Sequence, residues 1–569
     1  MRVTTSRVRA DARDVARLHI GSARSRWLGL GMTFAIVVLI TRAAGGLRWE
    51  SNDDAYMKAI ADGTLSGSPS YRIPYSEELL GVALSGLYSL TTSIPWYGLH
   101  IIVATVAAAF QIGWILSRPR FGLGLPGALL GVLLSTLPLA LFQQFTTAAA
   151  ISCAAGFLVL SDAIVHQQPS HRAGLFLLAG WLLRPQVLLL TGAIWLPFLV
   201  LSLVRLSRLS TIARPASQTG SVVLGGVAAN ALLTNVLQRT DPGYYEWREL
   251  DAARGRIHGD LINVDEQTLA AAGFEGTRDD WSMFESWNQW DEDIFTTDVL
   301  EFVANNGERA GLIDDIFLVH HTLDVVFDAS HGAAVFSEAL FFAAAAAGAF
   351  VLIRSPKRAL GILLSLLSFL LLAGYLKWNR NLPPRVMFAG LQQVLVMALF
   401  AAGGALRRPE GPSRRWTWRV PTFTAVLAGL SVMMALTVAG LDPPDVNDSD
   451  RDRDDIQSIA GTVIVAPSVL ELVASAPLSG SSMPSNAIPV GWLINHPDWQ
   501  ERVSAAGLDD LSRAIGLDPN VSLLAEPDGH ARIGGFLRRR GLPSAPSENR
   551  WTFNRGPTVN SIQSDVTTE

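Results

Sequence analysis

Long apolar runs alternate with polar segments along most of this chain. A helix of about 20 apolar residues crosses the roughly 30 Å hydrocarbon core of a bilayer. Segments of about this length lie near 27–46, 97–116, 123–142, 145–165, 173–184, 186–204, 219–238, 333–353, 359–376, 386–405 and 420–440. Arg184-Pro185 divides one of the apolar stretches in two, because proline removes a backbone donor and favours a break. The pattern predicts an all-α polytopic membrane protein with about eleven membrane-spanning helices.

Basic side chains occupy every second loop of this arrangement. The N-terminal segment 1–26 is rich in arginine, and lysine or arginine recurs after the second, fourth, sixth, eighth and tenth spans. Cytoplasmic loops carry such an excess of basic residues. We therefore expect a multi-pass protein of a bacterial plasma membrane, with a cytoplasmic N-terminus and an extracytoplasmic C-terminus.

Three polar regions would then lie outside the cytoplasm, namely 47–96, 239–332 and the tail 441–569. The first two are loops of a membrane domain that spans 27–440. In the tail, 462–465 and 521–524 have the composition of strands, whereas 498–515 and 530–540 have that of helices. The tail is therefore expected to be a small α/β extracytoplasmic C-terminal domain.

Composition agrees with a membrane protein. Of the 569 residues 49% are hydrophobic and 17% are charged, against about 25% charged residues in ordinary soluble proteins. The single cysteine, Cys153, lies within an apolar run and excludes an intrachain disulfide.

The first candidate site residues follow the first span. Asp53 and Asp54 are adjacent carboxylates just beyond its predicted outer end. There a carboxylate could take a proton from an acceptor hydroxyl, or could hold a divalent metal such as Mg²⁺ or Mn²⁺ that offsets phosphate charge. The alternative, about equally supported, is that the pair caps a helix at the membrane surface.

Cations on the predicted outer face are the second candidates. Arg184 interrupts an apolar run, and Lys377, Arg380 and Arg385 lie in a single outer loop. Outer loops are depleted in basic residues, so an anion is expected to compensate these four. A lipid phosphate would do so by charge-assisted hydrogen bonds. For Arg184, the alternative is a side chain that extends to the lipid headgroups. For the three cations of the outer loop, the alternative is pairing with the acidic loop of the protein.

Aromatic and acidic side chains alternate in the second outer loop, where Trp287, Trp290 and Asp291 are the clearest group. Indole rings can stack on sugar C–H faces, and carboxylates accept hydrogen bonds from sugar hydroxyls. These residues are therefore candidates for acceptor or sugar binding. The alternative is a tryptophan belt at the membrane interface.

These features resemble the GT-C superfamily of membrane glycosyltransferases. Its members are similar in having an acidic pair after the first helix, here Asp53 and Asp54, and a proline-bearing step toward the second span, here Pro74. The chain also resembles a group of Gram-positive, including actinobacterial, multi-pass membrane proteins without an assigned activity. The likeness to that group rests on three short motifs: Asn52-Asp53-Asp54, Ile94-Pro95-Trp96-Tyr97-Gly98 and Phe145-Thr146-Thr147.

The superfamily resemblance implies an inverting transfer of a sugar from a polyprenyl-phosphate donor to an acceptor of the cell wall or envelope. It implies Asp53 as base or metal ligand, with Asp54 beside it. The sequence departs from protein mannosyltransferases in having Asp-Asp in place of Asp-Glu and in lacking a clear His-Pro-Pro, so neither the sugar nor the acceptor follows.

Two other functions fit the same pattern. A transporter or flippase for a lipid-linked glycan would explain the spans and Arg184, but would place charges deep in several helices. A non-catalytic envelope scaffold would use the tail to bind wall polymer. An enzyme requires that Asp53 and the outer cations converge on one cavity.

Overall fold

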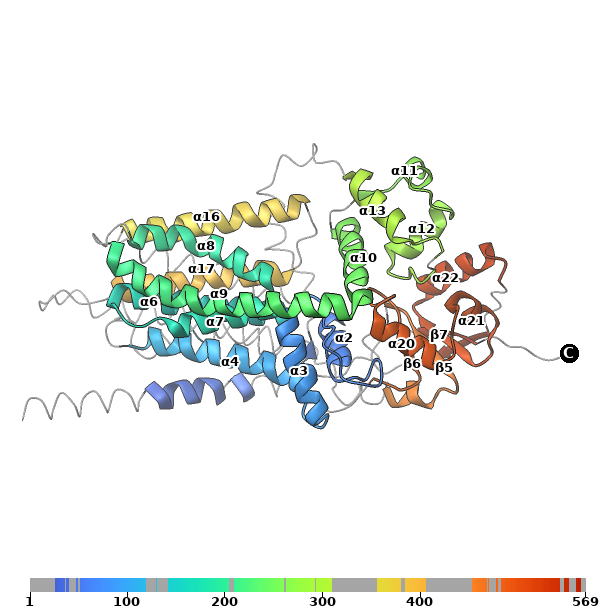
Figure 1. The fold of residues 1–569 in the computed structure, drawn as a ribbon, viewed down its shortest axis with the longest axis horizontal. Helices are drawn as coiled ribbons and strands as arrows, with labels where there is room; N and C mark the ends of the chain where they lie inside the picture. The colour runs from blue at the N-terminus through green and yellow to red at the C-terminus, as the bar shows by residue number, and fades with distance from the viewer. Residues whose placement is uncertain are drawn as a thin grey trace, which may run out of the picture.

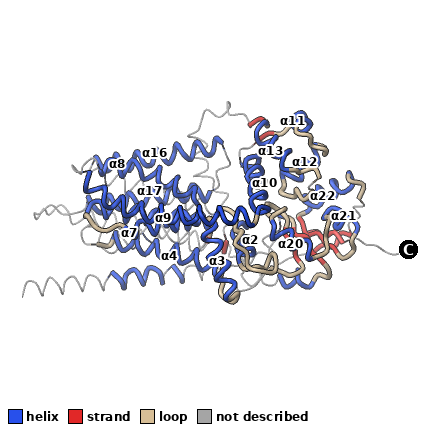
Figure 2. The backbone as a smooth tube through the Cα atoms, in the orientation of Figure 1, coloured by secondary structure: helices blue, strands red, loops and turns tan. Residues whose placement is uncertain are grey.

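The computed structural model describes residues 26–39, 48–118, 142–203, 209–309, 356–405, 453–542, 547–551 and 559–563, apart from a few short gaps inside these ranges. The described chain divides into an elongated bundle of apolar helices and a more polar part at one end of it (Figure 1). We call that end of the bundle the polar end. Strands are concentrated in the C-terminal region of the polar part (Figure 2).

The bundle surrounds one central helix. Its helices are α4 (Trp96–Leu116), α6 (Phe145–His166), α7 (His171–Leu183), α8 (Pro185–Leu203), α9 (Leu209–Thr240), α16 (Pro356–Asn379) and α17 (Pro384–Ala405). Helix α6 packs against α4, α7, α8, α9 and α17. Small residues make this packing close: a Cβ on Gly180 of α7 would lie 2.5 Å from Sγ of Cys153 in α6.

The surface of the bundle is apolar. Among the described residues, the helices Trp96–Leu116, Phe145–His166, Ile212–Thr240 and Arg358–Leu376 are long and apolar enough to cross a membrane. Leu189, Leu224 and Leu232 are each more than two-thirds exposed on the outside of the bundle. Such a contiguous apolar surface requires lipid rather than water around it. The chain is therefore a membrane protein.

The predicted spans are confirmed only in part. The division at Arg184-Pro185 is confirmed, since α7 ends at Leu183 and α8 begins at Pro185. The run at 219–238 belongs to a longer helix that begins at Leu209. The segments near 123–142, 333–353 and 420–440 lie almost wholly outside the described residues, so eleven spans stay a prediction.

The polar part begins with two short helices near the polar end, α2 (Asn52–Ala61) and α3 (Glu78–Leu90). It continues after α9 with α10 (Pro242–Gly259), α11 (Glu266–Ala271), α12 (Arg278–Glu285) and α13 (Thr297–Asn306). Local signals start these helices: Thr277 and Asp280 form a capping box at α12, which satisfies backbone donors of its first turn.

The C-terminal region forms a mixed five-stranded sheet in the order β6-β5-β7-β9-β8. Its strands are β5 (Thr462–Val465), β6 (Ala487–Pro489), β7 (Val521–Ala525), β8 (Ser547–Trp551) and β9 (Val559–Gln563). Strand β5 is parallel to β6 and β7, and β9 is antiparallel to β7 and β8. The predicted strands at 462–465 and 521–524 are confirmed.

The predicted helix over 498–515 is wrong. Two helices occupy it, α20 (Pro497–Ala505) and α21 (Leu511–Leu517). Gly507 has a φ of +72°, which ends the first helix, and the side chain of Asp510 accepts a hydrogen bond from the backbone of Arg513 to start the second. The helix predicted over 530–540 is α22 (Pro527–Arg539).

Candidate functional site

Asp54 fixes the first turn of α2 to the bundle. Its side chain is fully buried, and Oδ1 accepts hydrogen bonds of 3.1 Å from the hydroxyl of Tyr97 and 3.1 Å from the backbone N–H of Phe145. These donors belong to the first turns of α4 and α6, so a carboxylate there also suits the positive end of the α6 dipole. The neighbouring Asp53, which is only half-buried, is thereby placed at the polar end of the bundle.

Arg184 lies at the same end. It is the C-terminal cap of α7, and Pro185 favours the extended backbone it adopts, with a φ of −161° and a ψ of 104°. The guanidinium carbon lies 4.9 Å from the ring centre of Phe145 and 5.5 Å from that of Tyr75. The cation and the acidic pair therefore share Phe145 as a neighbour, although the sequence separates them by more than a hundred residues.

Tyr75 connects these groups. Its ring stacks on Phe145 at 6.2 Å, and its φ of +64° is strained for a residue that carries a Cβ. Burial raises the pKa of the Tyr75 hydroxyl well above its usual range, the charges of Asp251 and Asp53 raise it further, and Arg184 opposes them. The phenol therefore lies within the electrostatic reach of two carboxylates and one arginine.

Asp251, on α10, is the site residue that the sequence analysis missed. Desolvation raises the pKa of its carboxyl to about 6; Arg254 opposes the shift, Asp53 adds to it, and a hydrogen bond with Tyr75 lowers it. Asp251 lies three residues before Arg254 in a polar helix, which puts both on one face. The spacing of Asp251 and Arg254 was the only signal in the sequence for a site residue here. The sequence does not indicate that α10 lies near α2.

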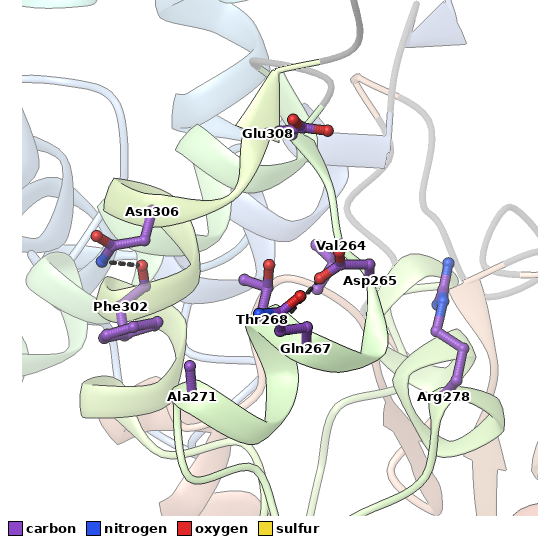
Figure 3. Close-up of a pocket in the computed structure, with 9 residues that line it drawn as sticks. All are labelled: Val264, Asp265, Gln267, Thr268, Ala271, Arg278, Phe302, Asn306 and Glu308. Atoms are coloured by element: carbon purple, nitrogen blue, oxygen red, sulfur yellow. Dashed lines mark hydrogen bonds between the residues drawn. The ribbon is translucent and has the colours of Figure 1, made fainter.

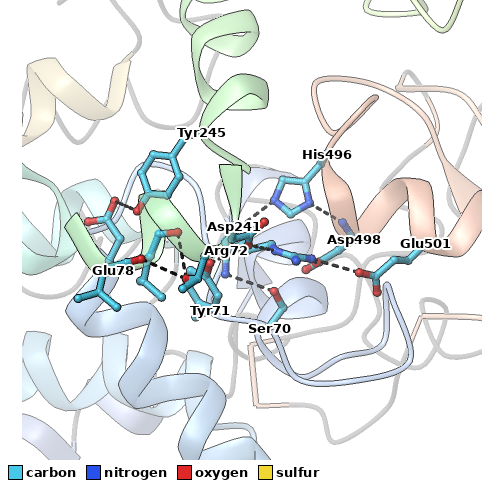
Figure 4. A network of polar contacts seen from close by, with 12 residues as sticks. Ser70, Tyr71, Arg72, Glu78, Asp241, Tyr245, His496, Asp498 and Glu501 are labelled. Atoms are coloured by element: carbon cyan, nitrogen blue, oxygen red, sulfur yellow. Dashed lines mark hydrogen bonds and ion pairs between the residues drawn. The ribbon is translucent and has the colours of Figure 1, made fainter. Parts of the chain in front are cut away.

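An ion-pair cluster joins the polar part near α2 to the C-terminal region (Figure 4). Nε of Arg72 lies 2.6 Å from a carboxylate oxygen of Asp241, and Nη1 lies 2.6 Å from Oδ1 of Asp498. Nδ1 of His496 accepts a hydrogen bond from the backbone of Asp498, which leaves Nε2 to donate to the carbonyl of Arg72 at 3.0 Å. The loop between α2 and α3 is thus joined to α9 and α20.

For the cations predicted after α16, the structure gives at most the position in a helix. Lys377 belongs to the last turn of α16 and Arg385 to the first turn of α17, whereas Arg380 lies outside the described residues. That these three cations converge with Asp53 on one cavity stays a prediction.

The aromatic group of the second outer loop contacts other parts of the chain. Trp287 stacks on His258 with 3.9 Å between ring centres. Nε1 of Trp290 donates to Oγ of Ser512 at 2.9 Å, and Asp291 forms an ion pair with Arg540. Trp290 and Asp291 therefore join this loop to the C-terminal region, and a role in binding sugar stays a prediction for all three.

A separate hollow of about 460 Å³ lies among α11, α12 and α13 (Figure 3). Its lining includes Gln267, Arg278, Phe302, Asn306 and Glu308. These residues belong to elements other than those that carry Asp53, Arg184 and Asp251, so this hollow is not part of the site.

A divalent metal does not fit the described residues well. Among them, no three His, Cys, Asp or Glu side chains are grouped so that they could hold a metal ion. Oδ1 of Asp54 is already bonded to two donors. The metal role predicted for Asp53 and Asp54 therefore has no supporting ligand set in the described part of the chain.

The fold and the site define a membrane protein with a mixed acidic and basic site at the polar end of its helix bundle. No family model matches the sequence, and no curated protein matches it. A solved structure similar to the chain is that of ArnT from Cupriavidus metallidurans in the apo state, with 11% identity, coverage of 95% of this chain and 98% of that chain, and a TM-score of 0.41. At that TM-score the likeness assigns neither a fold nor an activity, and the comparisons give no support to the Gram-positive resemblance.

Proposed function

We propose that the chain is a GT-C-type membrane glycosyltransferase that moves a sugar, with inversion, from a polyprenyl-phosphate donor to an extracytoplasmic envelope acceptor. One observation carries the proposal: at the polar end of an apolar helix bundle, the guanidinium of Arg184 lies 5.5 Å from the ring centre of Tyr75, and the hydroxyl of Tyr75 is hydrogen-bonded to Asp251 and near the charge of Asp53. A lipid phosphate and a water-soluble acceptor can meet only at such a boundary.

The proposed reaction uses these groups as follows. An acceptor hydroxyl attacks the anomeric carbon of the donor sugar, and the bond from that carbon to the phosphate oxygen breaks. Asp53 takes the hydroxyl proton, as a general base does. Arg184 compensates the negative charge that develops on the phosphate oxygen as its bond to the anomeric carbon breaks. No step is assigned to a metal, because the described residues offer no ligand set for one.

Asp251 and Asp54 have supporting roles in this proposal. At neutral pH a carboxyl with a pKa of about 6 is mostly ionised, so Asp251 can accept hydrogen bonds from sugar or acceptor hydroxyls. Asp54 positions Asp53 by holding the first turn of α2. Lys377, Arg380 and Arg385 remain candidates for a second contact with the donor phosphate.

The described helices favour an enzyme over a transporter. In the four helices of membrane length, the Asp, Glu, His, Lys and Arg side chains lie near the helix ends: His100, Asp162, His166, Arg214, Arg239 and Arg358. Transporters place substrate or ion sites near the middle of the bilayer. A strained Tyr75 beside a carboxyl with a raised pKa is, by contrast, typical of an active site.

Reconstitution of the protein in nanodiscs tests this proposal. The lipid extract and the envelope glycans of a deletion strain are supplied, and mass spectrometry follows the lipid-linked sugars. We expect the protein to convert a polyprenyl-phosphate sugar to polyprenyl phosphate and to extend a glycan. Arg184→Ala should lose this activity and Arg184→Lys should keep part of it, since lysine retains the charge without the bidentate geometry. Movement of the lipid across a bilayer without transfer of its sugar would instead identify a flippase.

A further inference from the structure

The segment of residues 490–496, between β6 and α20, has an unusual backbone. Gly491 has a φ of +141° and Asn495 a φ of +66°. Glycine and asparagine adopt positive φ angles more readily than other residues, so these two positions allow the chain to turn sharply on either side of Trp492.

Both ends of this segment are tied to the helices that carry the site carboxylates. The hydroxyl of Tyr56 on α2 donates to the carbonyl of Val490 at 3.1 Å. The carbonyl of Ile494 accepts hydrogen bonds from Nη1 of Arg254 at 2.9 Å and Nε1 of Trp247 at 3.1 Å, both on α10. The segment is therefore held between α2, which bears Asp53, and α10, which bears Asp251.

Trp492 is at the centre of the segment and faces the site aromatics. Its ring centre lies 5.4 Å from that of Tyr75 and 5.4 Å, edge to face, from that of Tyr56. Only 7% of the residue is exposed. Trp492 thus packs on the same phenol ring that Arg184 covers and on whose hydroxyl Asp53 and Asp251 act.

The indole N–H of Trp492 is buried and has no hydrogen-bond partner among the described residues. Other tryptophans of the described chain do donate, namely Trp96, Trp195, Trp247, Trp290 and Trp499. A buried polar group without a protein partner is uncommon in native proteins and calls for an explanation such as a functional role.

We propose that the N–H of Trp492 donates a hydrogen bond to an oxygen of the sugar-phosphate headgroup of the lipid-linked donor, so that the C-terminal region completes the active site. The inference rests on the proposed glycosyltransferase function. The carboxylates Asp53 and Asp251 can only accept hydrogen bonds when ionised, so the oxygens of the headgroup need donors from other residues. An indole N–H is a donor only, so Trp492 can supply such a hydrogen bond.

A comparison of two matched substitutions tests this inference. Trp492→Phe removes the unpaired N–H and keeps a ring against Tyr75. Trp499→Phe, in the same region, removes an N–H that donates to the carbonyl of Pro489 at 2.7 Å. Binding of polyprenyl phosphate and of polyprenyl-phosphate mannose and arabinose to each purified variant is measured by thermophoresis, and the thermal midpoint is measured without ligand.

We expect the two variants to differ in both measurements. Trp492→Phe should weaken lipid binding about tenfold or more, because a hydrogen bond to a charged group is lost. Trp499→Phe should leave binding unchanged and lower the thermal midpoint more than Trp492→Phe does, because both variants lose indole volume but only Trp499→Phe also loses an internal hydrogen bond. Weaker binding of all the lipids would place the contact at the phosphate, and weaker binding of a sugar-bearing lipid alone would place it at the sugar.

The outcomes also separate this inference from the function on which it rests. If the parent protein binds a lipid and Trp492→Phe binds it equally well, the role of Trp492 is wrong and the proposed function is untouched. If the parent protein binds none of these lipids, both the role of Trp492 and the polyprenyl-phosphate donor are contradicted.

Discussion

The backbone N–H of Phe145 donates a hydrogen bond of 3.1 Å to Oδ1 of Asp54, so the start of α2 is fixed to the start of α6. Asp53 is the adjacent residue, and its carboxylate can reach the groups around Tyr75 only while this contact holds. The acidic pair therefore divides into one residue that anchors and one that is available for chemistry.

Replacement of Asp54 should reveal this anchoring. Asp54→Ala leaves the N–H of Phe145 buried without this acceptor and leaves the hydroxyl of Tyr97 with Sδ of Met57, a weak acceptor at 3.6 Å; an unsatisfied buried donor costs about 1–3 kcal/mol. Asp54→Asn retains an acceptor oxygen and should stay close to the parent protein in stability. Thermal unfolding in detergent measures both variants. Equal stability of the alanine and asparagine variants would contradict the anchoring role.

The stability of the polar part should depend on pH through His496. Burial lowers the pKa of this imidazole to about 3, with Arg72 and Asp241 as its charged neighbours, against an unfolded value of about 6.5. Between these two values the unfolded chain binds a proton that the folded chain does not, so stability is full above the unfolded pKa and falls as the pH decreases toward 3. The slope contributed by this residue is at most about 1.4 kcal/mol per pH unit.

Thermal midpoints from pH 7 to pH 4 for the parent protein and for His496→Asn measure this contribution. Asparagine can still cap α20 but has no titrating ring. The variant should be less stable at pH 7 and less sensitive to pH, so that the two curves approach each other near pH 4. Asp498, whose pKa burial raises, titrates in both proteins and cancels in the comparison. If the thermal midpoints of the two proteins changed with pH in parallel, His496 would not be the source of the pH dependence.

The orientation of the chain yields a further prediction. Arg118, Asp162 and Ser170 lie at the end of the bundle opposite the polar part, where Arg118 pairs with Asp162 and Ser170 contacts the backbone of Pro215. The basic segments that flank these residues predict that this end lies in the cytoplasm. A reporter that is active only in the cytoplasm, fused after Glu569, should therefore be silent, whereas the same reporter fused after Arg120 should be active. An active fusion after Glu569 together with a silent fusion after Arg120 would show that the orientation is opposite to the one predicted.

Local signals predicted part of the fold and site. Apolar length and Pro185 located α7 and α8 to within about two residues, because helix ends in a membrane are set by nearby residues. Asp53 and Arg184 were proposed as site residues for the same reason, as charges where the apolar pattern breaks, and their roles stay a prediction.

The remaining features depend on contacts between distant segments. Asp251 on α10 interacts with Asp53 and Tyr75 although the sequence separates them widely, and Trp492 packs on Tyr75 from the C-terminal region. Trp290 and Asp291 resemble a sugar-binding group in the sequence, yet Ser512 and Arg540 are their partners. Periodicity along the chain carries no information on such pairs.

The most direct test of the account is the turnover of Asp53→Asn with the polyprenyl-phosphate sugar and acceptor that the reconstituted protein uses. Asparagine keeps the size and helix-capping ability of aspartate but cannot act as a base, so we expect turnover to fall about 10²–10⁴-fold with an unchanged thermal midpoint. Asp265→Asn, at the cap of α11, is the matched control and should turn over at the parent rate. Turnover of Asp53→Asn within a few-fold of the parent protein would contradict the catalytic role of Asp53 and leave it as an acidic residue in the first turn of α2.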